Sequence, residues 1–150
     1  MRRISIDVQY ACSAAGLPGR KQIASWVRAA LRDGAKNAEL TVRIVSEPEA
    51  AELNQRWRGI EGATNVLSFP ATGLEGIAPG LLGDVVICAT VVKREAEQQG
   101  KTLKAHWAHM VIHGTLHLLG HDHQDKSQAG IMEALETDIL GELGFQNPYE

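Results

Sequence analysis

The stretch HGTLHLLGHDH, residues 113–123, holds four of the chain's six histidines. His113 and His117 stand four residues apart, so in a helix their side chains project from the same face, one turn apart. Gly120 follows three residues later and allows the chain to leave the helix in a sharp turn. His123 comes three residues beyond this glycine, so a third imidazole can return toward the first two. We expect a helix end and a turn that gather three imidazoles.

The spacing His-x-x-x-His-x-x-Gly-x-x-His resembles the zinc signature of the metzincin peptidases, in which three histidines hold zinc and leave a position open for water. One Zn²⁺ ion is therefore expected on His113, His117 and His123. Metzincins place a general-base glutamate after the first histidine, whereas this chain has Gly114. Glycine cannot accept a proton from water, so the peptidase mechanism lacks its central group. An anionic substrate such as a phosphodiester needs this base less, since the ion attracts it and an arginine can share its charge.

Three further histidines leave the choice of ligands open. His106 and His109 fall on the same helical face as the first two ligands, and His121 lies just before the third. Any of them could replace a ligand in a different geometry. The simpler interpretations are that His106 and His109 pack or support the ligands from behind, and that His121 faces solvent in the loop.

Length and composition limit the architecture and the compartment. A chain of 150 residues with 44% apolar residues can bury one good core, so residues 1–150 are expected to form a single domain. The two cysteines, Cys12 and Cys88, are far apart in the sequence and suit a reducing compartment. No apolar segment follows the basic N-terminus, and the longest apolar run is too short for a bilayer. We expect a cytoplasmic protein with no membrane partner.

Charge is distributed unevenly along the chain. Residues 1–59 carry ten Lys or Arg against six Asp or Glu, a net +4, whereas residues 60–150 carry five against twelve, a net −7. The first part could attract an anion and the second could hold a cation. An ordinary solvated charge distribution explains the pattern equally well, because halves of a sequence need not be halves of a molecule.

Hydrophobic periodicity predicts an α+β domain with about five helices packed on a mixed four-stranded sheet. Residues 46–59 are expected to form a helix that begins with a capping box of Ser46 and Glu49, and Arg58 stands where this helix runs out into Gly59. A mobile surface loop is expected at residues 71–80. The strands are expected at residues 2–8, 38–45, 65–70 and 81–88, and the helices at residues 19–34, 46–59, 90–99, 104–119 and 127–143.

Five ordered segments resemble the YbeY family of bacterial metal-dependent endoribonucleases. The segments are LNQRWRG, TNVLSFP, LGDVVIC, HGTLHLLGHDH and MEALETDIL, so the likeness is far more specific than one motif. The resemblance implies a zinc site at His113, His117 and His123, and a catalytic and phosphate-binding role for Arg58. It also implies cleavage of single-stranded RNA in ribosomal RNA maturation, at the 3′ end of the small-subunit RNA, and in ribosome quality control. The implied partners are ribosomal RNA and the ribosome or its proteins.

The chain departs from the family pattern at two positions. Asn65 stands where many members have aspartate, and His121 stands where many have tyrosine. The remaining carboxylate of interest is Asp84, within an apolar strand, which we expect to be buried with a hydrogen-bonding partner. Two other functions remain open: a zinc metallopeptidase with an unusual base, and a ribosome-associated binding module whose zinc is structural.

Overall fold

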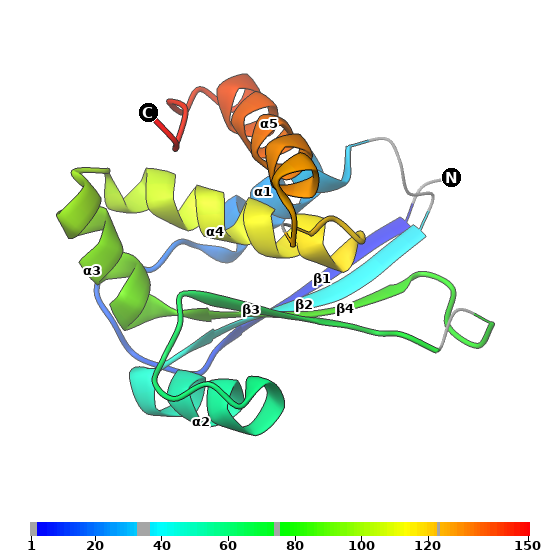
Figure 1. The fold of residues 1–150 in the computed structure, drawn as a ribbon. Coiled ribbons are helices and arrows are strands. Elements are labelled where there is room, and N and C mark those ends of the chain that lie inside the picture. Colours follow the sequence, from blue (N-terminus) through cyan, green and yellow to red (C-terminus); the bar gives the residue numbers. More distant parts are fainter. Residues whose placement is uncertain (1–2, 33–36, 74–75, 123) are drawn as a thin grey trace.

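The computed structural model describes residues 3–32, 37–73, 76–122 and 124–150, and over these ranges it confirms an α+β fold with a four-stranded mixed sheet and five helices (Figure 1). Within those ranges, no helix combines the length and the hydrophobicity needed to cross a bilayer. The elements are β1 (Arg3–Tyr10), α1 (Arg20–Leu31), β2 (Asn37–Val45), α2 (Glu47–Arg58), β3 (Val66–Pro70), β4 (Leu81–Cys88), α3 (Ala89–Gln99), α4 (Leu103–Leu118) and α5 (Lys126–Glu142).

The sheet has the strand order β1-β2-β4-β3. β2 runs parallel to both β1 and β4, whereas β3 pairs antiparallel with β4 at the edge. Parallel neighbours need a long crossover, which α1 supplies between β1 and β2. Val42, Ile44, Val85 and Ile87 on the two central strands are fully buried. The short strand β3 is therefore the edge across which groups from both faces of the sheet can meet.

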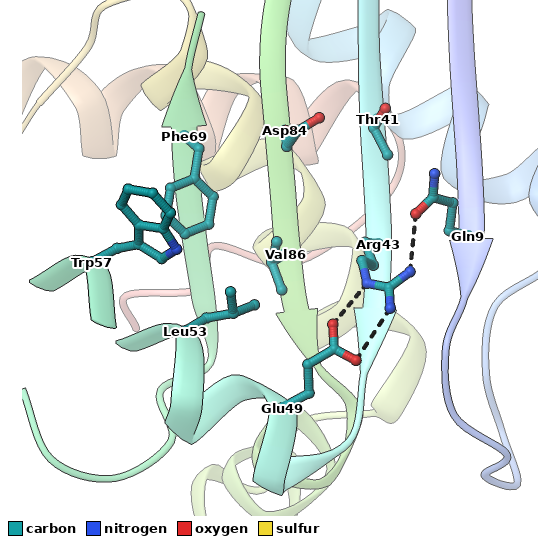
Figure 2. A pocket seen from close by; sticks show the side chains of 9 residues that line it. All are labelled: Gln9, Thr41, Arg43, Glu49, Leu53, Trp57, Phe69, Asp84 and Val86. Atoms are coloured by element: carbon teal, nitrogen blue, oxygen red, sulfur yellow. Dashed lines mark hydrogen bonds and ion pairs between the residues drawn. The ribbon is translucent and has the colours of Figure 1, made fainter. Parts of the chain in front are cut away.

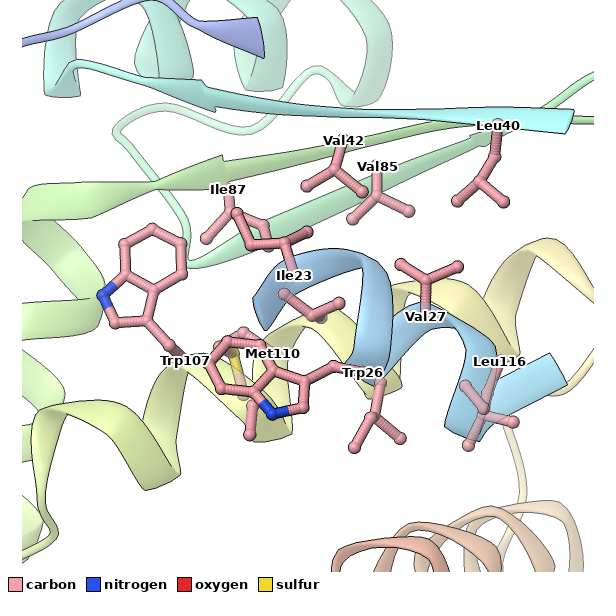
Figure 3. Close-up of a cluster of buried hydrophobic side chains, with 14 of the residues drawn as sticks. Ile23, Trp26, Val27, Leu40, Val42, Val85, Ile87, Trp107, Met110 and Leu116 are labelled. Atoms are coloured by element: carbon pink, nitrogen blue, oxygen red, sulfur yellow. The ribbon is translucent and has the colours of Figure 1, made fainter. Parts of the chain in front are cut away.

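Helices cover the sheet on both faces. In Figure 1, α1, α4 and α5 lie on one face and α2 lies on the other. The larger hydrophobic cluster fills the space between the sheet and the pair α1 and α4, where Trp26 and Trp107 are 3% and 1% exposed (Figure 3). Burying a large side chain stabilises the fold by roughly 1.5–3 kcal/mol, so α4 is fixed firmly against the sheet. Side chains at the end of α4 are therefore held in a defined position relative to the sheet.

The helix α2 begins and ends where the sequence predicts, but its start is not stabilised as expected. Ser46 is the N-cap residue, yet its side chain makes no capping hydrogen bond. The Glu49 carboxylate instead binds the Arg43 guanidinium of β2, at 2.7 and 3.2 Å. The predicted capping box is therefore wrong, because an ion pair with the neighbouring strand takes the glutamate. Gly59 ends the helix with a φ of 66°, as expected.

Candidate functional site

Four histidines lie along α4 and become more exposed toward its C-terminal end. His106 and His109 are 2% and 7% exposed, whereas the side chain of His113 is 18% exposed. The rings of His113 and His117 meet edge to face with their centroids 4.7 Å apart. The structure thus brings together the two helical histidines predicted as metal ligands. His123, the third predicted ligand, lies outside the described residues.

A buried carboxylate on α5 stands behind this row. Glu136 is fully buried and is hydrogen-bonded to His113 Nδ1, to His109 Nε2 at 2.9 Å, and to the Tyr149 hydroxyl, which donates. Burial alone would raise the pKa of Glu136, but the hydrogen bonds from both histidines and from Tyr149 outweigh it and hold that pKa at about 2. Burial and the bond to Glu136 raise the pKa of Tyr149 well above its ordinary range. Glu136 is therefore an ionised acceptor surrounded by donors.

The ligand atoms of His109, His113 and Glu136 lie within 4.8 Å of one another, so these three residues could hold a metal ion. Hydrogen bonds between them already account for this closeness, since both Glu136 oxygens accept from a histidine. A neutral imidazole that donates from Nδ1 carries its lone pair on Nε2, the form in which histidine binds metals. Glu136 thereby fixes the orientation and tautomer of His113 from behind.

The predicted turn at Gly120 is confirmed. Gly120 has a φ of 100°, and its backbone N–H donates to His117 O at 3.0 Å. The N–H of His121 then reaches back to Leu116 O at 3.1 Å, which satisfies the last carbonyls of the helix. The chain turns sharply out of α4 directly after the second histidine, and His121 follows as a half-buried residue.

Gly114 lies where α4 packs closely against the sheet. A Cβ at this position would stand 2.5 Å from Val85 Cγ1 and 3.2 Å from Val66 Cγ2. Val85 is fully buried, and the Gly114 carbonyl accepts a hydrogen bond from the Ser68 hydroxyl at 3.0 Å. A glutamate at position 114 would have to displace the core. The close packing of α4 on the sheet therefore conflicts with a peptidase base at this position.

A cleft of about 610 Å³ opens beside the two histidines. Arg58 lines it from the C-terminal end of α2, and His113 and His117 line it from α4. These helices cover opposite faces of the sheet, so the cleft crosses the edge strand β3, whose residues 66–69 form part of its wall. Asp122 and Gln124 add polar groups beyond the turn. The cleft brings the candidate anion-binding arginine and the candidate metal ligands to one cavity.

Asn65 has a structural role at the start of β3. Its side-chain NH₂ group donates to the Glu95 carboxylate at 3.1 and 3.3 Å, and its backbone carbonyl accepts from the Cys88 N–H at 2.9 Å. The same carboxylate binds His106 Nε2 at 2.8 Å. Burial lowers the pKa of His106, although Glu95 opposes the shift. The start of β3 is thus tied to α3 and α4.

The expectation for Asp84 is wrong. Asp84 is exposed and faces the α2 side of the sheet, because side chains alternate along β4 and the buried neighbour Val85 faces α4 (Figure 2). Sequence reasoning also missed Glu136, although a signal existed. Glu136 follows Met132 by one helical turn, which places a carboxylate on the apolar face of α5. No sequence pattern pointed to Tyr149.

Known proteins resemble this chain along nearly its whole length. A family model described as "Endoribonuclease YbeY" matches residues 14–144. Proteins named Endoribonuclease YbeY from Xanthomonas campestris pv. campestris (strain B100) and Xanthomonas axonopodis pv. citri (strain 306) are each 52% identical over 151 residues, covering 98% of this chain and 94% of the relative. The solution structure of TM1509 from Thermotoga maritima matches with a TM-score of 0.59 and 24% identity, covering 95% of this chain and 99% of that one.

Proposed function

This chain belongs to the YbeY endoribonuclease family, and we propose that it is a metal-dependent endoribonuclease that cleaves single-stranded RNA during ribosomal RNA maturation in the cytoplasm. The observation that carries the proposal is the shared cleft of Arg58, His113 and His117. A phosphodiester in this cleft meets a guanidinium on one side and two imidazoles on the other. Arginine binds phosphate oxygens bidentately, so Arg58 suits the charge of a scissile phosphate.

One zinc ion would be held by His113, His117 and His123. The chemistry of the donor set fits, because the hydrogen bond from His113 Nδ1 to Glu136 selects the tautomer whose Nε2 carries the lone pair that a metal binds. The adjacent ring of His117 and the turn at Gly120 support the same grouping. His123 is assigned as the third ligand from its spacing in the sequence. When bound, zinc supplies Lewis acidity at the phosphoryl group and activates water.

The residues of the cleft have separate tasks. Arg58 binds and orients the phosphate, and its fixed charge stabilises the additional negative charge of the transition state. It lies at the end of α2, before the αL residue Gly59, and lines the same cleft as the residues of β3. Glu136, ionised and desolvated, holds His113 in one tautomer. Specific recognition of ribosomal RNA would require a ribosomal partner, since the chain carries a net charge of −3 and lacks a strongly basic composition.

The packing of Gly114 favours the nuclease over the metallopeptidase. A peptidase of this signature needs a carboxylate next to the first histidine, and the contact with Val85 leaves no space for one. Incubation with a peptide library separates the two functions, because a nuclease should leave every peptide intact. Retained RNA cleavage after loss of the metal would instead favour the binding module with structural zinc.

The decisive experiment measures metal content and cleavage of single-stranded RNA together. His113→Ala and His123→Ala should lose both, whereas Arg58→Ala should keep the metal and lose at least about 100-fold in kcat. Arg58→Lys should recover only part of the rate, because lysine cannot bind phosphate bidentately. Arg28→Ala is the matched control, since Arg28 is exposed on α1 and remote from the cleft. Undiminished cleavage in folded Arg58→Ala and His113→Ala proteins would overturn the proposal.

A further inference from the structure

A second cavity, of about 510 Å³, lies on the α2 face of the sheet (Figure 2). It has no part in the chemistry assigned to Arg58 and the histidines. Two aromatic residues, Trp57 and Phe69, line both this cavity and the cleft beside the histidines. The two cavities are therefore neighbours that share an aromatic wall. A chain molecule held in one of them can reach the other.

Trp57 is the unusual part of this wall. It is 63% exposed, whereas the other two tryptophans, Trp26 and Trp107, are buried. The indole meets the Phe69 ring edge to face at 6.4 Å, and Figure 2 shows it beside Phe69 at the margin of the cavity. It directly precedes Arg58 at the end of α2. A large exposed aromatic ring beside a phosphate-binding group is the arrangement with which proteins stack unpaired bases.

The remaining lining suits an uncharged, planar ligand. Arg43 is already neutralised by Glu49 and also donates to Gln9 at 3.0 Å, so it offers little charge to a phosphate. Leu53 and Val86 provide apolar surface. Asp84 and Thr41, paired across β4 and β2, place a carboxylate and a hydroxyl at the cavity. The exposed carboxylate can accept hydrogen bonds from an amino group.

We propose that this cavity binds one unpaired nucleobase of the RNA, stacked on Trp57 and hydrogen-bonded to Asp84 through an exocyclic amino group. A phosphate next to that base then lies at Arg58, on the other side of the aromatic wall. The inference rests on the proposed function, because it takes RNA as the substrate of the cleft. It adds a preference for adenine, cytosine or guanine over uracil at one position of the strand, because uracil has no amino group.

Fluorescence tests the stacking directly, because Trp57 is the exposed tryptophan of the three. A short single-stranded RNA, added with a chelator so that it stays intact, should quench the fluorescence of the wild-type protein. The Trp57→Phe variant, which keeps only the two buried tryptophans, should show no quenching. RNA with one abasic nucleotide, scanned along the strand, should lose most of the quenching at a single position. Absence of quenching in the wild type, or quenching that persists in Trp57→Phe, would overturn the inference.

Kinetics tests the same contact in the working enzyme. Trp57→Ala should raise KM about ten-fold or more, Trp57→Phe should retain most of the affinity, and Asp84→Ala should abolish discrimination against uracil. Ile131→Ala is the control, an exposed apolar residue on α5 that lines neither cavity. An unchanged KM in folded Trp57→Ala refutes the inference and leaves the proposed function intact. If the wild-type protein cuts no RNA, the proposed function fails, and the quenching measurement still decides whether Trp57 binds a base.

Discussion

Glu136 controls the proposed metal site through His113, although it need not touch the ion. Its carboxylate accepts from His113 Nδ1 and His109 Nε2 and is fully buried. In Glu136→Gln the shape is kept, but the negative charge is lost and the amide can donate as well as accept. The variant should bind zinc about 10- to 100-fold more weakly, because the tautomer and basicity of His113 are no longer fixed. Competition with a chromophoric chelator measures this affinity without reference to catalysis.

Glu133→Gln is the matched control for that prediction. Glu133 lies one turn earlier on α5 and is exposed. Its substitution should leave zinc affinity unchanged. Equal affinities for Glu136→Gln and the wild type would show that the carboxylate only fills space behind the histidines.

At single positions, sequence spacing predicted local geometry well, whereas it did not predict which polar side chains are buried. The relation of His113 to His117 and the turn at Gly120 follow from helical geometry, and both are confirmed. The environment of Asp84 depends on which face of the sheet α2 covers, and nothing near Asp84 in the sequence encodes that. The orientation of Glu136 was readable from the apolar spacing of α5, whereas its partner Tyr149 was not.

The close contact between α4 and the sheet predicts that replacing glycine by alanine has opposite effects on stability in α4 and in α5. Alanine is a better helix former than glycine by about 1 kcal/mol, so Gly130→Ala in α5, where a Cβ meets nothing within 4 Å, should stabilise the protein. Gly114→Ala gains the same propensity but places its Cβ 2.5 Å from Val85 Cγ1. Overpacking a core costs about 1–3 kcal/mol, so this substitution should be net destabilising.

Urea unfolding measures the contribution of this contact to stability. The proteins to compare are Gly114→Ala, Gly130→Ala, Val85→Ala and the double variant of Gly114→Ala with Val85→Ala. In a Val85→Ala background the space is open, so Gly114→Ala should cost less than it does in the wild type. A Gly114→Ala protein as stable as Gly130→Ala would mean that Val85 moves aside freely. The core would then also accommodate a larger side chain, such as glutamate, at position 114.

Element boundaries were predicted well where backbone chemistry sets them. Gly59 and Gly100 end α2 and α3 in the αL conformation, as expected. The start of α3 was predicted at Thr90, but the helix continues directly from β4 with Cys88 as its N-cap. Strand pairing could not be predicted from the sequence. The strand β4 pairs with β2, although α2 and the edge strand β3 lie between them in the chain.

The order of the strands is what creates the cleft. β3 lies at the edge beside β4, so α2 and α4, on opposite faces, can both contribute side chains to a cavity over that edge. Arg58 and His113 are far apart in the sequence and meet only in this topology. Spacing in the sequence indicated His113, whereas the role of Arg58 was implied by the family resemblance. The shared cavity supplies the physical reason.

The charge of the whole molecule sets how its RNA binding should respond to salt. Part of the positive charge of residues 1–59 is neutralised by α5, since Arg32 pairs with Asp138 at 2.8 Å and with Glu142 at 3.7 Å. Among the described residues that line the cleft, Arg58 is the one lysine or arginine. Each phosphate contact to a single strand contributes a slope of about −0.7 to the logarithm of affinity against the logarithm of salt concentration.

Binding of a short single-stranded RNA, measured by anisotropy with the metal chelated, should therefore have a shallow slope near −0.7. Arg58→Ala should flatten this slope, because it removes the phosphate contact, whereas Arg28→Ala should leave it unchanged. A much steeper slope that survives Arg58→Ala would place the RNA on another basic surface. One phosphate contact and one stacked base together give modest affinity for free RNA, so specific binding would need a ribosomal partner.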